Sequence, residues 1–234
     1  MTAREAILSA VRANRPTPAV DIPEVPTSTD HSQVEGGIGY SGHLADLAEV
    51  GGFPAEGDPV VPYFVKHLDA MGGRSFEVGG AASAAAKLAE LFPDAKVVCS
   101  ATPEIPGTRR AGDVADPHAL KDVDVGVVRS RLGVAEAGAV WLDQGDLTHP
   151  ALGVLAQHLV VLLDPAAIVP TLHDAYGGRL DPSASPYGVF MAGPSATGDI
   201  EGVIIHGAQG ARTLTVMLLA APSPDSTEAP PAAR

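Results

Sequence analysis

The 234-residue chain has one cysteine, Cys99, and only 4% aromatic residues. A single cysteine excludes an intrachain disulfide, and it excludes the sets of thiolates that iron–sulfur clusters and structural zinc sites usually need. Cys99 follows Val97 and Val98 in a run typical of a buried strand, so we interpret it as an inert core thiol. With so few aromatic rings, the core is expected to be aliphatic.

Positive charge is also scarce. The chain has 15 Lys and Arg against 28 Asp and Glu, a net charge of −13, which disfavours a nucleic-acid surface. The largest basic cluster is the pair Arg109-Arg110, so binding to an anionic membrane is not expected. No apolar run reaches ~18 residues, and the N-terminus lacks a signal-peptide core. We therefore predict a cytoplasmic protein with no membrane insertion and no nucleic-acid partner.

Prolines and periodicity divide the chain. Thr2-x-x-Glu5 is a capping box before helically spaced apolar residues, which predicts an N-terminal helix. Four prolines between residues 16 and 26 predict an extended arm over 15–31, followed by a glycine-rich loop. The predicted organisation is a helix (1–14), an arm and loop (15–58), an α/β domain (59–220) and a disordered tail (221–234).

The domain alternates apolar strands with helices. Continuous apolar runs such as His158–Leu163 are typical of strands that are covered on both faces, so we predict a mainly parallel sheet flanked by helices. Such sheets bind ligands beyond the carboxyl ends of their strands. Helices are expected at Tyr63–Met71, Ala81–Leu91 and Pro165–Ala175; strands are expected at Ser75–Val78, Lys96–Ser100, Val123–Val128, Ala139–Leu142, His158–Leu163, Tyr187–Ala192 and Thr213–Leu219.

The segment Gly193–Glu201 combines small residues, two hydroxyls and two carboxylates between two apolar runs, Tyr187–Ala192 and Val203–Ile205. Ser195, Thr197 and Asp199 are N-capping or phosphate-contacting residue types, and free backbone N–H groups at such a turn bind anions. We interpret the segment either as an anion-binding turn at a strand end, between two buried strands, or as a well-capped connection.

The segment Arg129–Gly138, which contains Glu136, is a second candidate site. It joins the predicted strands Val123–Val128 and Ala139–Leu142. A carboxylate flanked by Ala and Gly is accessible, so Glu136 is positioned to contact either a ligand or the loop backbone; the alternative is a helix-surface Glu with Gly138 as the cap. His206, beside Gly207, is either a site neighbour or a rim histidine. No HExxH or similar close histidine pair occurs, so no metal site is predicted.

These pieces together resemble a known family. Ala135-Glu136-x-Gly138 before a strand, then Ile168-Val169-Pro170-Thr171-Leu172, then Gly193-Pro194-Ser195-x-Thr197-x-Asp199-Ile200-Glu201 and Gly207-x-x-Gly210 are similar to the LUD domain. More narrowly, they resemble the lactate-utilisation protein C (LutC/YkgG) family. The resemblance covers roughly residues 60–220. It departs at Ala137 and Ala139, where the family usually has threonines, and at Ala196, where it usually has arginine.

The resemblance implies a fold like that of the NagB/RpiA/CoA-transferase group and a role in oxidising L-lactate to pyruvate beside iron–sulfur partner proteins. No cofactor is expected in this chain, because the clusters would lie in the partner subunits. We expect a non-redox subunit that binds a small anionic ligand or assembles the complex. The alternatives are an independent isomerase, CoA-transferase or folate cyclo-ligase-like enzyme that uses Glu136, and a scaffold without its own ligand.

The predicted site places both motif segments in one crevice at strand ends. Glu136 is the candidate catalytic residue, and the candidate ligand-binding residues are Gly133, Gly138, Gly193, Ser195, Thr197, Asp199, Glu201 and His206.

Overall fold

The computed structural model describes residues 3–13, 54, 57–181, 183–199 and 202–219. The chain forms two units, Met1–Gly37 and Ile38–Arg234. In the first, the predicted N-terminal helix is present as α1 (Ala3–Ala13), with Glu5 in the first turn, where a carboxylate favours the helix dipole. The predicted arm, most of the loop that follows it and the C-terminal tail lie outside the described residues. No helix in the described ranges is long and apolar enough to cross a membrane.

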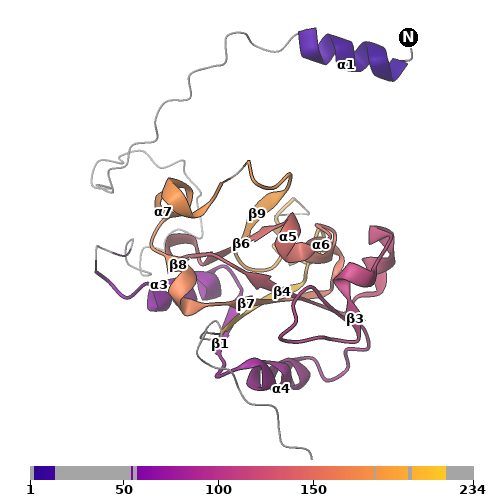
Figure 1. Ribbon diagram of the computed structural model, residues 1–234. Helices are drawn as coiled ribbons and strands as arrows, with labels where there is room; N and C mark the ends of the chain where they lie inside the picture. The colour runs from indigo at the N-terminus through magenta and orange to yellow at the C-terminus, as the bar shows by residue number, and fades with distance from the viewer. Residues whose placement is uncertain (1–2, 14–53, 55–56, 182, 200–201, 220–234) are drawn as a thin grey trace, which may run out of the picture. The chain divides into compact units, whose positions relative to one another are not determined.

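A six-stranded parallel sheet forms the centre of the second unit (Figure 1). Its inner strands are continuous apolar runs, and β7 pairs along its whole length with both β12 and β4. The predicted mainly parallel α/β fold is therefore confirmed. In spatial order the strands are β1 (Arg74–Glu77), β12 (Thr213–Leu218), β7 (His158–Leu163), β4 (Val125–Ser130), β2 (Val98–Ser100) and β3 (Arg109–Arg110).

A second sheet of four strands is largely antiparallel, with only β8 and β5 running parallel. Its order is β8 (Ile168–Val169), β5 (Gly133–Val134), β6 (Ala139–Asp143) and β9 (Gly188–Met191). Strand β6 is buried on both faces. Val140 and Leu142 join the main core, whereas Trp141 packs on the other side against Phe190, with ring centroids 4.8 Å apart.

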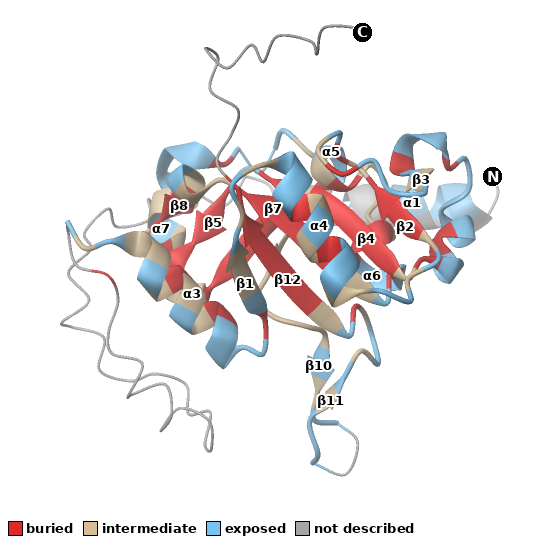
Figure 2. Cartoon of the chain, turned by 90° about the horizontal axis from the view of Figure 1, so that it is seen from below, coloured by how far each residue is buried: buried red, intermediate tan, exposed pale blue. Residues whose placement is uncertain are grey.

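Both faces of the parallel sheet are covered (Figures 1 and 2). On one face, helix α4 (Ala81–Leu91) buries Ala84 and Leu88 against strand residues such as Val160. On the other face, helix α3 (Val60–Ala70) buries Phe64 and Leu68 in the core that the second sheet also joins. Burial on both faces explains why the central strands are apolar throughout, without the alternation of a half-exposed strand.

Short helices and turns connect the strands. The α-helices are α5 (Gln144–Leu147), α6 (Leu152–Leu155) and α7 (Leu172–Asp174). The 3-10 turns are η2 (Ala111–Asp113), η3 (Pro117–Asp122), η4 (Ala135–Ala137) and η5 (Pro165–Ala167), and η6 (Ala175–Arg179) is a π-turn.

Two predictions from the sequence are wrong. The helix expected over Pro165–Ala175 is instead η5, β8 and α7, because β-branched Ile168 and Val169 pair with β5 and Pro170 cannot continue a helix. The buried strand expected at Val203–Ile205 is absent. Val203 and Ile204 are exposed, and Ile205 alone enters a strand of that run, β11 (Ile205–His206).

Candidate functional site

Glu136 lies in the turn η4, at the tip between β5 and β6. Its Oε1 accepts a hydrogen bond from the backbone N–H of Leu172 at 2.7 Å, and its own N–H donates to the carbonyl of Pro170 at 3.0 Å. Leu172 is the first residue of α7, so the carboxylate satisfies an N-terminal N–H that has no partner within the helix. Glu136 is therefore held against the loop backbone, which was one of the two roles expected for it.

Gly138 and Gly193 both contact the C-terminal half of α3. Gly138 has φ +55°, and a side chain there would collide with the backbone of Leu68. Gly193 has φ +76°, and a side chain there would collide with the carbonyl oxygen of Met71. The β6–β9 pairing ends at Val140 and Met191, so Gly138 lies two residues before this strand pair and Gly193 two residues after it. The structure thus places the end of the Glu136 segment and the start of the second motif against the same end of α3, with backbones in close approach.

After Ser195 the described part of the second motif enters a projecting hairpin, in which β10 (Ala196–Thr197) pairs with β11 (Figure 2). Ser195 anchors its base, since its N–H donates to the carbonyl of Ala211 at 2.9 Å and its carbonyl accepts from Gly207 at 2.8 Å. Towards the tip, the side chains of Val203 and Ile204 are 61% and 57% exposed.

The hydroxyl and carboxylate of the hairpin bond to each other. Thr197 Oγ1 donates to Asp199 Oδ2 at 3.1 Å, and both groups lie near the exposed end. Ala196, where the resembling family has arginine, pairs with His206, and both are exposed. Glu201 lies outside the described residues. Gly133 is elsewhere, buried in β5 against Leu163.

The predicted position of the crevice needs correction. We expected the Gly193–Glu201 turn beyond the carboxyl ends of parallel strands, but the strand before it, β9, belongs to the antiparallel sheet. The turn consequently lies beside the amino ends of β7 and β12. A cavity of about 220 Å³ there is lined by Gly193, Pro194 and Ser195 together with Leu159 and Leu214.

At the carboxyl ends of the parallel strands the charged groups pair with one another. Arg129 in β4 binds Glu104 at 2.6 Å, and Thr102 donates to the same carboxylate. Burial acts to raise the pKa of Glu104, but the hydrogen bond from Thr102 and the charge of Arg129 lower it below its usual value. Arg129 and Glu104 thus form an ion pair that Thr102 supports with a hydrogen bond. None of the three was among the candidate catalytic or ligand-binding residues predicted from the sequence.

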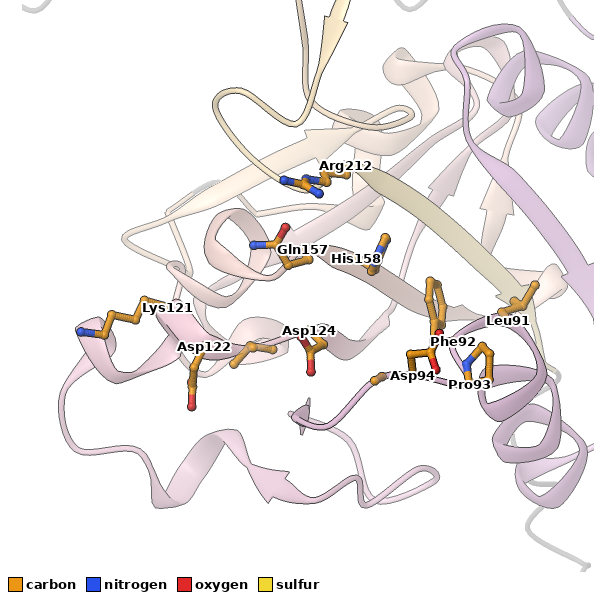
Figure 3. A pocket seen from close by; sticks show the side chains of 12 residues that line it. Leu91, Phe92, Pro93, Asp94, Lys121, Asp122, Asp124, Gln157, His158 and Arg212 are labelled. Atoms are coloured by element: carbon orange, nitrogen blue, oxygen red, sulfur yellow. The ribbon is translucent and has the colours of Figure 1, made fainter.

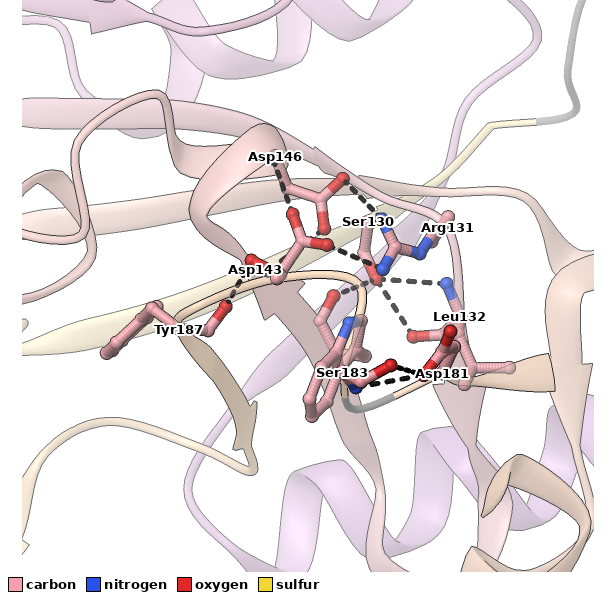
Figure 4. A network of polar contacts seen from close by, with 10 residues as sticks. Ser130, Arg131, Leu132, Asp143, Asp146, Asp181, Ser183 and Tyr187 are labelled. Carbon is pink, nitrogen blue, oxygen red and sulfur yellow. Dashed lines mark hydrogen bonds and ion pairs between the residues drawn. The ribbon is translucent and has the colours of Figure 1, made fainter. Parts of the chain in front are cut away.

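A second carboxylate cluster stands at the end of β6 (Figure 4). Asp143 and Asp146 accept hydrogen bonds from each other's backbone N–H at 3.0 Å, and Arg131 binds Asp143 at 2.5 Å. Burial raises the pKa of Asp146 to about 6, with a further contribution from the charge of Asp143. Burial also acts on Asp143, but hydrogen bonds from Asp146 and Arg131 bring its pKa below the usual value. These two residues were not singled out from the sequence. The spacing Asp143-x-x-Asp146 directly after a buried strand is the signal that could have found them.

Cys99 lies in the middle of β2 and is fully buried, and burial raises the pKa of its thiol. A buried thiol with a raised pKa is a poor nucleophile. Within the described residues, no group of three or more His, Cys, Asp or Glu is placed to hold a metal ion.

Comparison with known proteins gives a family match over the segment that carries both motifs. Residues 116–219 match the family model of the LUD domain. The LUD domain match begins at η3 and ends just beyond β12, so it includes Glu136, Gly193 and the described part of the hairpin. The LUD family is associated with lactate utilisation.

A solved structure supports the same fold. A DUF162 family protein from Deinococcus radiodurans aligns with a TM-score of 0.54 at 16% sequence identity. The alignment covers 69% of this chain and 96% of that protein. At this identity the match shows the fold alone. No curated protein matches the chain significantly.

Proposed function

We propose that this chain is a non-redox subunit of an L-lactate utilisation system, of the lactate-utilisation protein C type, which assembles with iron–sulfur partner proteins in the cytoplasm. The observation that carries the proposal is the position of the second motif. Beyond Ser195 its described residues belong to a projecting hairpin, and two large exposed aliphatic residues, Val203 and Ile204, follow the motif in that hairpin.

Exposed aliphatic side chains on a protruding element favour contact with another protein. Full burial of a fully exposed side chain of this size contributes about 1.5–3 kcal/mol, so burying the exposed parts of Val203 and Ile204 would favour association as one part of a larger interface. The hairpin base is fixed to the loop before β12 through Ser195, so the tip is presented on a defined support. Pre-organisation of this kind reduces the entropy cost of association.

We assign no redox role to this chain because it has too few cysteines to hold an iron–sulfur cluster. Cys99 is the single cysteine in the sequence, and its burial in β2 leaves it unable to ligate a cluster with partners from this chain. Electrons from lactate would therefore pass through cysteine-rich partner subunits. The LUD match supports the link to lactate, and the protein C subfamily is the finer assignment that we propose.

The hairpin is tested by Ile204→Asp, with Tyr176→Asp as the matched control. Tyr176 is also a large exposed apolar residue, 52% exposed, but lies outside the hairpin. We expect Ile204→Asp to lower co-purification of the iron–sulfur partners by roughly tenfold, equivalent to 1.4 kcal/mol, and to abolish growth of a complemented deletion strain on L-lactate. The control should retain both. Wild-type growth and co-purification with Ile204→Asp would refute the proposal.

The alternative of an independent enzyme is tested at Glu136. Glutamine retains the oxygen that accepts from Leu172, so Glu136→Gln should preserve the fold, and under our proposal it should also preserve growth on L-lactate. Loss of growth with an unchanged melting temperature would instead assign Glu136 to chemistry. Ile204→Asp and Glu136→Gln together therefore distinguish an assembly role of the hairpin from catalysis by Glu136.

A further inference from the structure

A larger cavity, of about 540 Å³, opens at the amino ends of the parallel strands, outside the predicted site (Figure 3). Its volume lies within the range of small-molecule sites, about 300–1,000 Å³. One wall is the end of α4 and the loop after it (Leu91–Ala95), and another is the segment before β4 (Lys121–Asp124). Between them lie Gln157, His158 and Arg212.

The sheet register places the polar residues in a row. Thr213, His158 and Val125 lie side by side on β12, β7 and β4. Arg212, Gln157 and Asp124 each precede one of these residues, so they form the adjacent row at the mouth of the strands. Neighbouring strands are about 4.8 Å apart, which sets the backbones of Arg212 and Gln157 within reach of one small ligand.

Most carboxylates around the cavity are already committed. Asp122 is paired with Arg109 through two contacts of 2.7 and 2.8 Å. Asp124 Oδ2 accepts hydrogen bonds from the backbone N–H groups of Lys96 and Val97 at 2.8 and 2.9 Å, and these bonds lower its pKa. Asp94 is exposed at the rim.

Arg212, by contrast, is uncommitted. Among the residues that the structure describes, no hydrogen bond or ion pair engages its guanidinium, which is exposed beside Gln157 and His158 (Figure 3). An unpaired guanidinium in a cavity presents a planar set of donors that suits a carboxylate or a phosphate.

The opposite wall is apolar and aromatic. Phe92 stacks on His158 with ring centroids 4.8 Å apart, and Leu91 and Pro93 lie beside it. His158 Nδ1 is hydrogen-bonded to Thr213 Oγ1 at 2.9 Å. Burial first, and the charge of Arg212 second, lower the pKa of His158 against the opposing charge of Asp124, which favours the neutral ring. The wall thus offers uncharged ring surface close to Arg212.

We propose that this cavity binds a small organic anion, with its carboxylate or phosphate held by Arg212 and Gln157 and its apolar or aromatic body against Phe92. The proposal does not rest on the proposed function.

The test is calorimetric titration of the full chain with three probes. Phenyl phosphate carries both parts of the proposed ligand, inorganic phosphate carries only the anion, and benzyl alcohol carries only the ring. Phenyl phosphate should bind, and each of the partial probes should bind roughly tenfold more weakly or not at all. No measurable binding of phenyl phosphate at millimolar concentration would overturn the proposal.

Variants locate the site. Arg212→Gln should weaken phenyl phosphate binding by roughly tenfold or more, and Arg212→Lys by less, because lysine keeps the charge but loses the planar fork. Arg74→Gln is the matched control, since Arg74 is an exposed arginine in β1 that does not line the cavity. Equal affinity of wild type and Arg212→Gln would overturn the assignment.

A spectroscopic readout separates binding at this cavity from binding elsewhere. A bound anion beside Arg212 offsets the positive charge that acts on His158, so the pKa of His158 measured by NMR should rise on addition of phenyl phosphate. The rise should disappear in Arg212→Gln. An unchanged His158 titration in wild type with bound phenyl phosphate would place the ligand at another site and reject the proposal.

Discussion

Both motif segments contain glycine and a carboxylate, and the fold uses the two carboxylates in opposite ways. The Glu136 turn is folded inward, with its carboxylate bonded to the start of α7 and Gly138 packed on α3. The hairpin after Gly193 is folded outward, and within the described residues its carboxylate, Asp199, accepts a hydrogen bond from neighbouring Thr197. A carboxylate therefore fixes the packing of one segment and lies exposed in the other, and the surrounding fold decides which.

The largest effect is expected for a substitution in the Glu136 turn, at Gly138. Gly138→Ala must place a Cβ at φ +55° against the backbone of Leu68, so it combines left-handed strain with overpacking. We expect a loss of about 3 kcal/mol in the free energy of unfolding, measured by urea denaturation. Gly198→Ala on the hairpin is the control, because its Cβ would meet Ile204 at an ordinary 3.5 Å. Similar losses for the two variants would contradict the contrast.

The second prediction concerns pH and the inward region, where β6 ends. The pKa of Asp146 is about 6 in the folded chain, above its unfolded value of about 3.9. The folded state then binds more protons between these values, so this group's contribution to stability falls as pH rises from about 4 to 6, by about 2–3 kcal/mol.

Asp146→Asn should remove this dependence, so the variant should gain on wild type as pH rises through the same window. Chemical denaturation at pH 4 and pH 7 measures the difference. Asp143→Asn is the contrasting variant: the pKa of Asp143 is lowered, and its ion pair with Arg131 stabilises the fold above the unfolded pKa. An equal difference between wild type and Asp146→Asn at both pH values would contradict the prediction.

The smallest effects compare the two carboxylates directly. Glu136→Ala leaves the half-buried N–H of Leu172 without its partner, so we expect a loss of about 1–2 kcal/mol. Asp199→Ala removes an exposed local bond and should cost less than about 0.5 kcal/mol. Thermal unfolding of both variants measures the order, and a reversed order would show that the hairpin, not the Glu136 turn, is the more constrained segment.

Much of the parallel sheet was predictable because its central strands are recognisable as continuous apolar runs. His158–Leu163 and Thr213–Leu218 are apolar without interruption, which fits a strand that is covered on both faces. The segment over Pro165–Ala175 was predicted wrongly because its local signals are ambiguous. Proline at a first helical position is typical of a helix, yet pairing of Ile168 and Val169 with β5 outweighs that preference.

The sequence by itself determined an α/β domain with an aliphatic core and a lone core thiol, and it marked two motif segments. The tertiary structure decided what those segments do. Strand β9 pairs antiparallel with β6, which turns Gly193 towards the amino ends of the parallel strands and sends the hairpin outward. The row of Arg212, Gln157 and Asp124 also arises only from strand register. Residue spacing records local geometry, but it does not record which strands become neighbours, because that choice depends on packing across the whole core.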